Sequence, residues 1–115
     1  MMKERYVIGV DLGTSSVKTV LVNPSGQVAY ETSESYELLQ PQAGYSEQRP
    51  EDWVQGTIVS LRRLVEGAGI SPDSVEGISF SGQMHGLVLV DQQGQVLRNA
   101  ILWNDTRTTA QCRRI

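Results

Sequence analysis

A polar turn near the start of the chain has the residue types of an anion-binding loop. It reads Asp11-Leu12-Gly13-Thr14-Ser15-Ser16, and Lys18 follows two residues later. Glycine lets backbone N–H groups approach an anion closely, hydroxyls can donate to phosphate oxygens, and Asp11 can hold Mg²⁺ through water. It is not a Walker loop, which needs Gly-x-x-x-x-Gly-Lys-Ser/Thr and leads into a helix. From these residues alone, an ordinary hairpin turn is the alternative.

A second cluster reads Ser81-Gly82-Gln83-Met84-His85-Gly86. Gln83 offers a donor and an acceptor, His85 can do either, and Met84 supplies an adaptable apolar wall. This mixture suits a small polyol with an apolar edge. His85 is the only histidine, which excludes a zinc site built on several histidines. A satisfied, half-buried histidine is the alternative reading.

The third cluster reads Trp103-Asn104-Asp105-Thr106-Arg107. Tryptophan can form a wall against the C–H face of a sugar, while Asn, Asp and Arg can pair with hydroxyls or with one another. The alternative is a core tryptophan, a helix cap and a surface ion pair. We interpret three further acids as solvated loop and helix-end residues: Glu47, Glu51 and Asp52.

The elements that must position these clusters follow from hydrophobic patterning. Apolar runs predict strands over Tyr6–Leu12 and Val17–Val22, and a third, rich in Thr and Ser, over 27–36. Short turns join them, so they must form an antiparallel meander, because parallel strands need long crossovers. All three clusters follow apolar strands, where α/β folds place ligand sites.

The rest of the chain predicts one helix and further short strands. After a loop over 37–49, Pro50 and two acids suit a helix start, and apolar residues then recur at helical spacing up to Glu66. Its apolar positions are Val54, Ile58, Leu61 and Val65. Strands are expected over 75–80 and 100–103, with a hairpin over 87–97 between them. A last helix should open near Thr106, capped by Asn104 or Asp105.

Composition bounds the function classes. The 115 residues suffice for one domain, and a net charge of −3 excludes a strongly basic nucleic-acid surface and a polyacidic tail. The single cysteine, Cys112, excludes an internal disulfide. The first apolar run is broken by Asp11 and Gly13, so no signal-peptide core or membrane span is predicted, and we expect a soluble cytoplasmic protein. The last helix begins without an end signal, so we expect an excerpt of a longer protein.

These motifs resemble a known family. Val10-Asp11-Leu12-Gly13-Thr14-Ser15-Ser16-Val17-Lys18 resembles the opening of the FGGY carbohydrate kinases, which belong to the actin, hexokinase and heat-shock ATPase superfamily. Tyr45–Gln48 with Pro50–Trp53 resembles the loop before the family's first helix. Gly82–Gly86 with Ala100–Asp105 is similar to the xylulokinases of this family, whereas glycerol kinases carry an Arg-Glu pair in place of Met84-His85. The resemblance covers nearly the whole chain.

The resemblance implies an α/β, ribonuclease H-like fold: a mixed sheet with an antiparallel three-strand meander. Residues 1–115 would be the N-terminal part of the sugar-binding domain, without the C-terminal nucleotide-binding domain. The family's general-base Asp would lie beyond Ile115. By matching position, the residues implied for ATP are Asp11, Gly13, Thr14, Ser15 and Lys18, with Asp11 also near Mg²⁺. Those implied for the sugar are Gln83, Met84, His85, Trp103, Asn104 and Asp105.

The implied reaction transfers the γ-phosphoryl of ATP to the 5-hydroxyl of D-xylulose, and the partners are the sugar and ATP, with no nucleic acid or membrane. We expect the 115-residue piece itself to be inactive. The alternatives are a family kinase for gluconate, ribulose or glycerol, a non-catalytic ATPase-fold module, and a small stand-alone binding domain. Uncovered apolar sheet surface would favour self-association as a homodimer.

Overall fold

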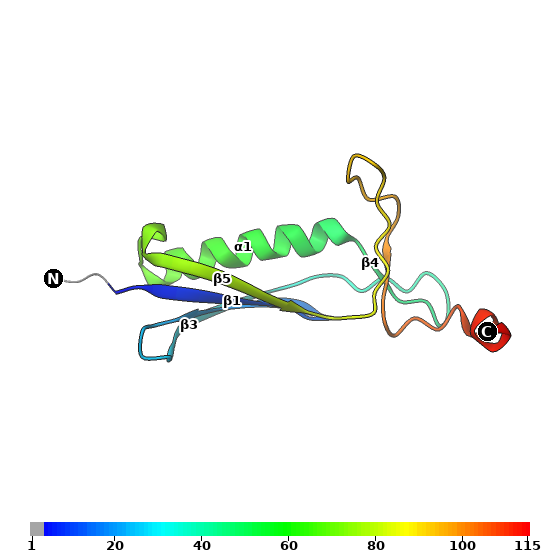
Figure 1. The fold of residues 1–115 in the computed structure, drawn as a ribbon, viewed down its shortest axis with the longest axis horizontal. Coiled ribbons are helices and arrows are strands. Elements are labelled where there is room, and N and C mark those ends of the chain that lie inside the picture. The colour runs from blue at the N-terminus through cyan, green and yellow to red at the C-terminus, as the bar shows by residue number, and fades with distance from the viewer. Residues whose placement is uncertain (1–3) are drawn as a thin grey trace. The chain divides into compact units, whose positions relative to one another are not determined.

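The computed structural model describes residues 4–115 as two compact units of mixed α/β structure. Unit 1 comprises residues 4–36 and 53–82, and unit 2 comprises residues 37–52 and 83–115. The elements in chain order are β1 Tyr6–Leu12, β2 Ser16–Val22, β3 Val28–Ser35, β4 Glu47–Gln48, α1 Pro50–Ala68, the 3₁₀ helix η1 Pro72–Ser74, β5 Val75–Gly82, β6 Ala100–Ile101 and α2 Thr109–Arg114 (Figure 1). Within residues 4–115, no helix combines the length and apolar character needed to cross a membrane.

Unit 1 holds a four-stranded sheet in the order β3-β2-β1-β5. The first three strands pair antiparallel, so the predicted meander is confirmed. β5 pairs parallel with β1, and α1 supplies the crossover that a parallel pair requires. In the turn between β2 and β3, the Asn23 carboxamide accepts the N–H groups of Ser25 and Gln27, each at 3.0 Å. The result is a mixed sheet, as expected.

Helix α1 lies along one face of this sheet (Figure 1). Alternate residues of β1 and β2 point toward it, and they form the core of unit 1 together with one helix residue: Ile8, Val10, Val17, Leu21 and Leu64. The opposite face carries Asp11 and Lys18, which are exposed. Period-2 alternation therefore puts the hydrophobic core on one side of the sheet and the polar candidates on the other.

The predicted helix is confirmed and ends at Ala68, but its predicted apolar face is partly wrong. Val54 and Ile58 are 57% and 41% exposed, whereas Ser60 and Leu64 are fully buried. The Ser60 Oγ lies 3.0 Å from Thr19 Oγ1 and 2.9 Å from Thr32 Oγ1, so the buried hydroxyls satisfy one another. Hydrophobic spacing does not indicate small, polar residues that form helix–sheet contacts.

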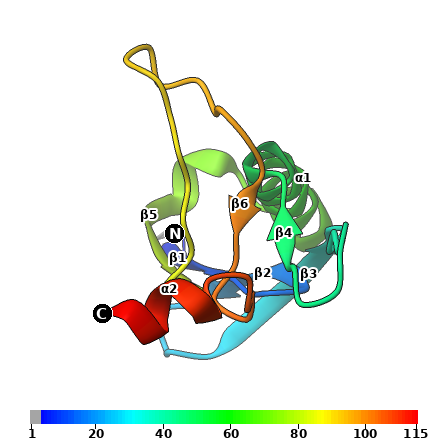
Figure 2. The same cartoon turned by 90° about the vertical axis from the view of Figure 1, so that its right-hand side faces the viewer.

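Unit 2 is organised by a pairing that the sequence analysis placed in a loop. β4 pairs antiparallel with β6, and the two strands lie side by side (Figure 2). The expected strand over 100–103 is thus only two residues long. The expected hairpin over 87–97 is reduced to a single bridge between Val90 and Val96, around a turn in which the Asp91 carboxylate accepts two backbone N–H groups.

The last helix begins later than predicted. α2 starts at Thr109 with Thr108 at its N-cap, so neither Asn104 nor Asp105 caps it. The reason lies in unit 2 itself: the Asp105 carboxylate already accepts the backbone N–H of Ser46 at 2.7 Å and the guanidinium of Arg107. A side chain bound to a distant partner is not available to a nearby helix end.

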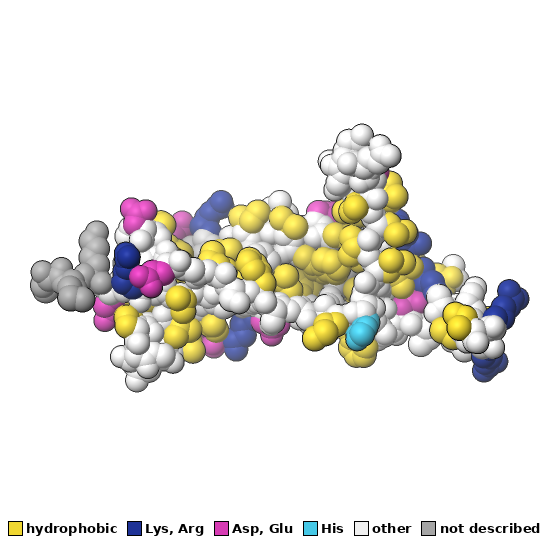
Figure 3. All heavy atoms as spheres, in the orientation of Figure 1, with side chains coloured by type: hydrophobic (Ala, Val, Ile, Leu, Met, Phe, Trp, Pro, Cys, Tyr) yellow, Lys and Arg dark blue, Asp and Glu magenta, His cyan; other side chains and the backbone are white. Residues whose placement is uncertain are grey.

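Apolar side chains are exposed in both units (Figure 3). On β5, Ile78 and Phe80 are 47% and 61% exposed, which is the uncovered sheet surface that the sequence analysis expected. In unit 2, the segment between β5 and β6 exposes six more: Leu87, Val88, Leu89, Val90, Val96 and Leu97. Self-association through such surfaces stays a prediction.

Candidate functional site

The Gly13–Ser16 turn connects β1 to β2 in unit 1. The Gly13 N–H donates to the Ser16 carbonyl at 2.9 Å and closes the turn. A Cβ added at Gly13 would lie only 3.2 Å from that carbonyl oxygen, so the closure favours glycine. Thr14 and Ser15 therefore stand at the tip, between two strands that fix both ends of the turn.

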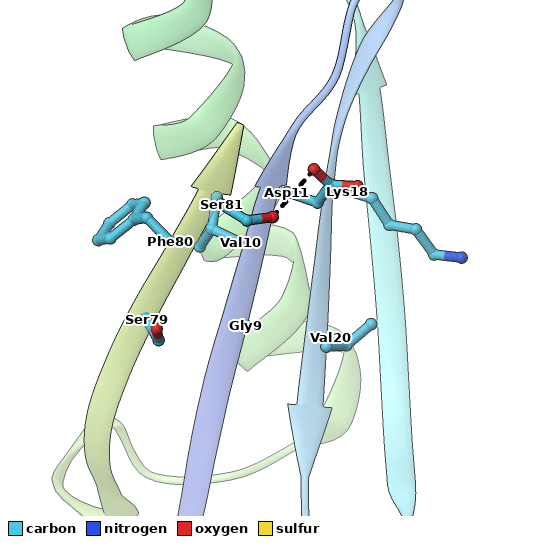
Figure 4. A pocket seen from close by; sticks show the side chains of 8 residues that line it. All are labelled: Gly9, Val10, Asp11, Lys18, Val20, Ser79, Phe80 and Ser81. Carbon is cyan, nitrogen blue, oxygen red and sulfur yellow. Dashed lines mark hydrogen bonds between the residues drawn. The ribbon is translucent and has the colours of Figure 1, made fainter. Parts of the chain in front are cut away.

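Asp11 lies beside this turn, on the sheet face opposite α1. Its register partners are Lys18 on β2 and Ser81 on β5, and its Oδ1 accepts the Ser81 hydroxyl at 3.2 Å (Figure 4). The three side chains line an open hollow of about 440 Å³. The Lys18 ammonium extends away from Asp11, and its Nζ lies 3.5 Å from a carboxylate oxygen of Glu31 on β3.

The donor set around Asp11 limits how a cation could be held. No group of three or more His, Cys, Asp or Glu side chains that could bind a metal ion occurs in the described part of the chain. A single carboxylate fits Mg²⁺, which usually keeps several waters and binds through one or two carboxylates together with phosphate oxygens. A lone carboxylate at this position is compatible with Mg²⁺ held through water, and this role of Asp11 stays a prediction.

Tyr36 is a residue of this region that the sequence analysis did not single out. Its hydroxyl donates to the Gly13 carbonyl and lies 3.0 Å from the Ser16 carbonyl oxygen. Its backbone N–H donates to the Ser15 carbonyl at 3.2 Å. Burial raises the pKa of the Tyr36 phenol, and the nearby charge of Asp11 raises it further, so the group stays a proton donor. Only the strand register brings Tyr36 here, because Ser35 pairs with Ser16 and the next residue therefore lies beside the turn.

The second polar segment starts at the same edge of the sheet as the turn. In the parallel pair of β1 and β5, Leu12 lies opposite Gly82. Gly13 follows one strand end and Gln83 follows the other. Two chain segments with chemically capable side chains therefore leave neighbouring strands at their carboxyl ends, where ligands bind in open α/β sheets.

Gln83 is held by a buried partner in unit 2. Its Nε2 donates to Oε1 of Gln48 at 3.2 Å, and Gln48 on β4 is fully buried. The Gln83 Oε1 is buried and has no hydrogen-bond partner among the described residues. An orphaned acceptor of this kind points to a missing donor, such as a water or a ligand hydroxyl.

The remaining sugar-side candidates of unit 2 are exposed. Met84 and Trp103 are 73% and 56% exposed, so neither is part of a core. His85 is exposed as well, and its φ of 61° makes it the one non-glycine residue in the left-handed region within residues 4–115. Such strain persists mainly at functional sites. Asn104 is exposed beside Trp103.

A buried charge network holds the segment that carries Trp103. Glu47, whose side chain is 7% exposed, accepts hydrogen bonds from Arg107 at 2.6 Å and Arg98 at 2.7 Å. Arg107 also binds Asp105, whose side chain is 2% exposed, at 2.7 Å, and lies over the ring of Tyr45 at 3.7 Å. The interpretation of Glu47 as a solvated loop acid is therefore wrong. Asp105 pairs with Arg107, which is one of the alternatives that the sequence analysis left open. A contact between Asp105 and a sugar stays a prediction.

The other two acids behave as the sequence analysis expected. Glu51 and Asp52 lie in the first turn of α1. Asp52 also accepts a hydrogen bond from Arg49 at 3.1 Å. Both carboxylates therefore suit the positive end of the helix dipole.

The network should make unit 2 sensitive to acid. The Arg107 guanidinium lowers the pKa of Glu47, and it holds the pKa of Asp105 far below its usual range. A carboxyl group with a lowered folded-state pKa contributes stability above its unfolded pKa of about 4, and that stability is lost as the pH falls toward the folded value. We expect the urea midpoint to be flat above about pH 5 and to fall steadily below it. Asp105→Asn should flatten the acid limb, and an unchanged slope would contradict this assignment.

Comparison with known proteins assigns nearly the whole chain to one protein family. Residues 6–115 match the N-terminal domain of the FGGY family of carbohydrate kinases. The chain is 65% identical to a xylulose kinase of Bacillus subtilis over 96% of its own length and 22% of that protein. It is 50% identical to a xylulose kinase of Staphylococcus epidermidis over its full length and 23% of that protein.

Solved structures agree with the sequence relatives. The crystal structure of a xyloylose kinase from Brucella ovis superimposes with a TM-score of 0.91 at 34% identity, covering 96% of this chain and 23% of that one. The chain therefore spans about a fifth of the length of the relatives that it matches.

Proposed function

Because the chain belongs to the FGGY family of carbohydrate kinases, with the fold of the actin, hexokinase and heat-shock ATPase superfamily, we propose that it is the sugar-side segment of an ATP-dependent, cytoplasmic D-xylulose kinase. The observation that carries the proposal is the parallel register that sets Leu12 opposite Gly82. It starts the Gly13–Ser16 turn and the Gln83–His85 segment at one edge of one sheet. The xylulose kinases at 65% and 50% identity support the choice of sugar.

The turn side of the proposed site handles phosphate. The hydroxyls of Thr14 and Ser15 would donate to phosphate oxygens of ATP, and the carboxylate of Asp11 would hold Mg²⁺ through water. When bound, Mg²⁺ neutralises charge on the transferring phosphoryl group. Lys18 adds positive charge to the same rim, although its ammonium pairs with Glu31.

The sugar side supplies orientation. Gln83 and His85 provide donors and acceptors for hydroxyls, Met84 and Trp103 provide apolar walls, and Asn104 adds a carboxamide. In the proposed step, the 5-hydroxyl oxygen of the sugar forms a bond to the γ-phosphorus while the bond to the ADP oxygen breaks. The hydroxyl proton passes to the family's general-base Asp, expected outside these 115 residues. Positioning and charge neutralisation carry most of such a reaction.

The direct test is an activity profile of the full-length protein that contains this segment. Sugar-dependent ADP release is measured with D-xylulose, D-ribulose, gluconate and glycerol, and the highest kcat/KM is expected for D-xylulose. Turnover of another sugar without turnover of D-xylulose would refute the proposal that D-xylulose is the substrate. Failure to phosphorylate any sugar would favour the non-catalytic ATPase-fold module instead. The 115-residue segment alone, which lacks the proposed base, should show no turnover.

Substituting His85 should separate sugar binding from folding. In the full-length protein, His85→Ala is expected to raise the KM for the sugar roughly 10- to 100-fold, because one or two hydrogen bonds are lost. The KM for ATP should change less than about threefold. Steady-state kinetics with each substrate varied in turn measures both values.

His85→Gly is the matched variant. Glycine adopts the left-handed backbone without strain, so this protein should unfold at an equal or higher urea concentration than the wild type. It should still lose sugar affinity as His85→Ala does. If His85→Gly kept the wild-type KM for the sugar, only the backbone conformation of residue 85 would matter, and the side-chain role would be refuted.

A further inference from the structure

Tyr36 binds the Gly13–Ser16 turn at three points. Its hydroxyl reaches the carbonyls of Gly13 and Ser16, and its backbone N–H donates to the carbonyl of Ser15. Three of the four carbonyl groups of the turn therefore face a donor on one residue. Because Tyr36 follows β3 directly and Ser35 pairs with Ser16, the sheet register fixes the point from which it acts.

These contacts affect anion binding because they fix the direction in which the carbonyl groups of the turn point. A turn binds phosphate by pointing N–H groups at it, and any carbonyl oxygen that rotates toward the anion repels it. Donors that hold the carbonyls on the far side keep the N–H side of the turn toward the ligand. Tyr36 supplies two such donors, one from its side chain and one from its backbone.

The tyrosine ring lies beside helix α1, near Gly56. A Cβ added at Gly56 would lie 3.7 Å from Cδ1 of Tyr36 and 3.4 Å from a methyl group of Val17. The ring thus packs under the helix where the helix has no side chain. A methyl group at position 56 would make only ordinary van der Waals contacts there, so the ring lies within packing distance of the helix without depending on this glycine.

We propose that Tyr36 is a positioning residue for nucleotide phosphate: it acts through the Gly13–Ser16 turn and does not touch the substrate itself. This inference rests on the proposed function, because it assigns a phosphate to that turn. It predicts that loss of the Tyr36 hydroxyl changes the KM for ATP and leaves the KM for the sugar unchanged. A purely structural tyrosine would instead affect ATP and sugar alike, through the amount of folded protein.

The test uses the full-length protein with Tyr36→Phe, which removes only the hydroxyl. The control is Tyr30→Phe, a tyrosine on β3 that is 40% exposed and outside the site. For Tyr36→Phe we expect the KM for ATP to rise roughly 3- to 10-fold, the equivalent of one hydrogen bond, with an unchanged KM for the sugar. Backbone amides of Thr14 and Ser15 should exchange hydrogen faster than in the wild type. Tyr30→Phe should match the wild type in all three measurements.

A second variant guards against an indirect effect on folding. Gly13→Ala loosens the same turn from within, because its Cβ would crowd the Ser16 carbonyl. If Tyr36 acts through the turn, the two changes should be less than additive in the KM for ATP when combined. Full additivity, an unchanged KM for ATP, or equal changes in both KM values would overturn the inference. Absence of sugar phosphorylation by the wild type would refute the proposed function, and this inference with it, before any variant is made.

Discussion

Asp11→Asn in the full-length protein is expected to lower kcat/KM for phosphoryl transfer roughly 10²- to 10³-fold. Asparagine keeps the shape of the side chain and an oxygen that can accept the Ser81 hydroxyl, so the strand ends should stay in place. It removes the negative charge that, in the proposed function, would hold Mg²⁺ through water near the transferring phosphoryl group. Losing one preorganised electrostatic contact of this kind typically costs two to three orders of magnitude.

The measurement is ADP release at saturating sugar with ATP varied, together with the binding of the sugar alone by calorimetry. Sugar affinity should change little, because the proposed function assigns Asp11 to the phosphate side. Glu76→Gln is the matched control, since it neutralises an exposed carboxylate of the same sheet that pairs with Arg5. If Asp11→Asn retained activity within about threefold of the wild type, the assignment of the turn to phosphate would be wrong.

Asp105→Ala should destabilise unit 2 by roughly 2–4 kcal/mol. The side chain is 2% exposed, and its removal leaves the Arg107 guanidinium without one carboxylate and the Ser46 N–H without its acceptor. Buried donors that lose a charged partner carry a large desolvation penalty. Urea denaturation monitored by tryptophan fluorescence would report the loss, and limited proteolysis should cut within residues 100–115 first.

The control for this prediction is again the exposed pair of Arg5 and Glu76. Their side chains are 61% and 51% exposed, so Glu76→Gln should change the free energy of unfolding by less than about 0.5 kcal/mol. Equal effects of the two substitutions would mean that the unit 2 network is no more stabilising than a surface ion pair. An effect of Asp105→Ala on sugar KM at full stability would instead favour a direct sugar contact.

Local pattern determined the elements of unit 1. The strands at the N-terminus, the meander and the helix from Pro50 onward were predictable because each rests on residue type and spacing within about twenty positions. The Gly13–Ser16 turn and the Gln83–His85 segment were also evident from sequence, since each sits at the end of an apolar run. Belonging to the FGGY family was equally readable from these motifs and is confirmed.

Only the tertiary structure decided what the polar residues of unit 2 and the small residues of α1 do. Glu47 and Arg107 are 60 positions apart, and nothing local indicates that they form a buried pair. The β4–β6 pairing joins segments separated by a similar distance, and Tyr36 reaches a turn 20 residues before it only through the strand register. A polar side chain can cap a helix, pair with a distant residue or bind solvent equally well. Which of these it does depends on long-range packing, which cannot be inferred from local residue spacing.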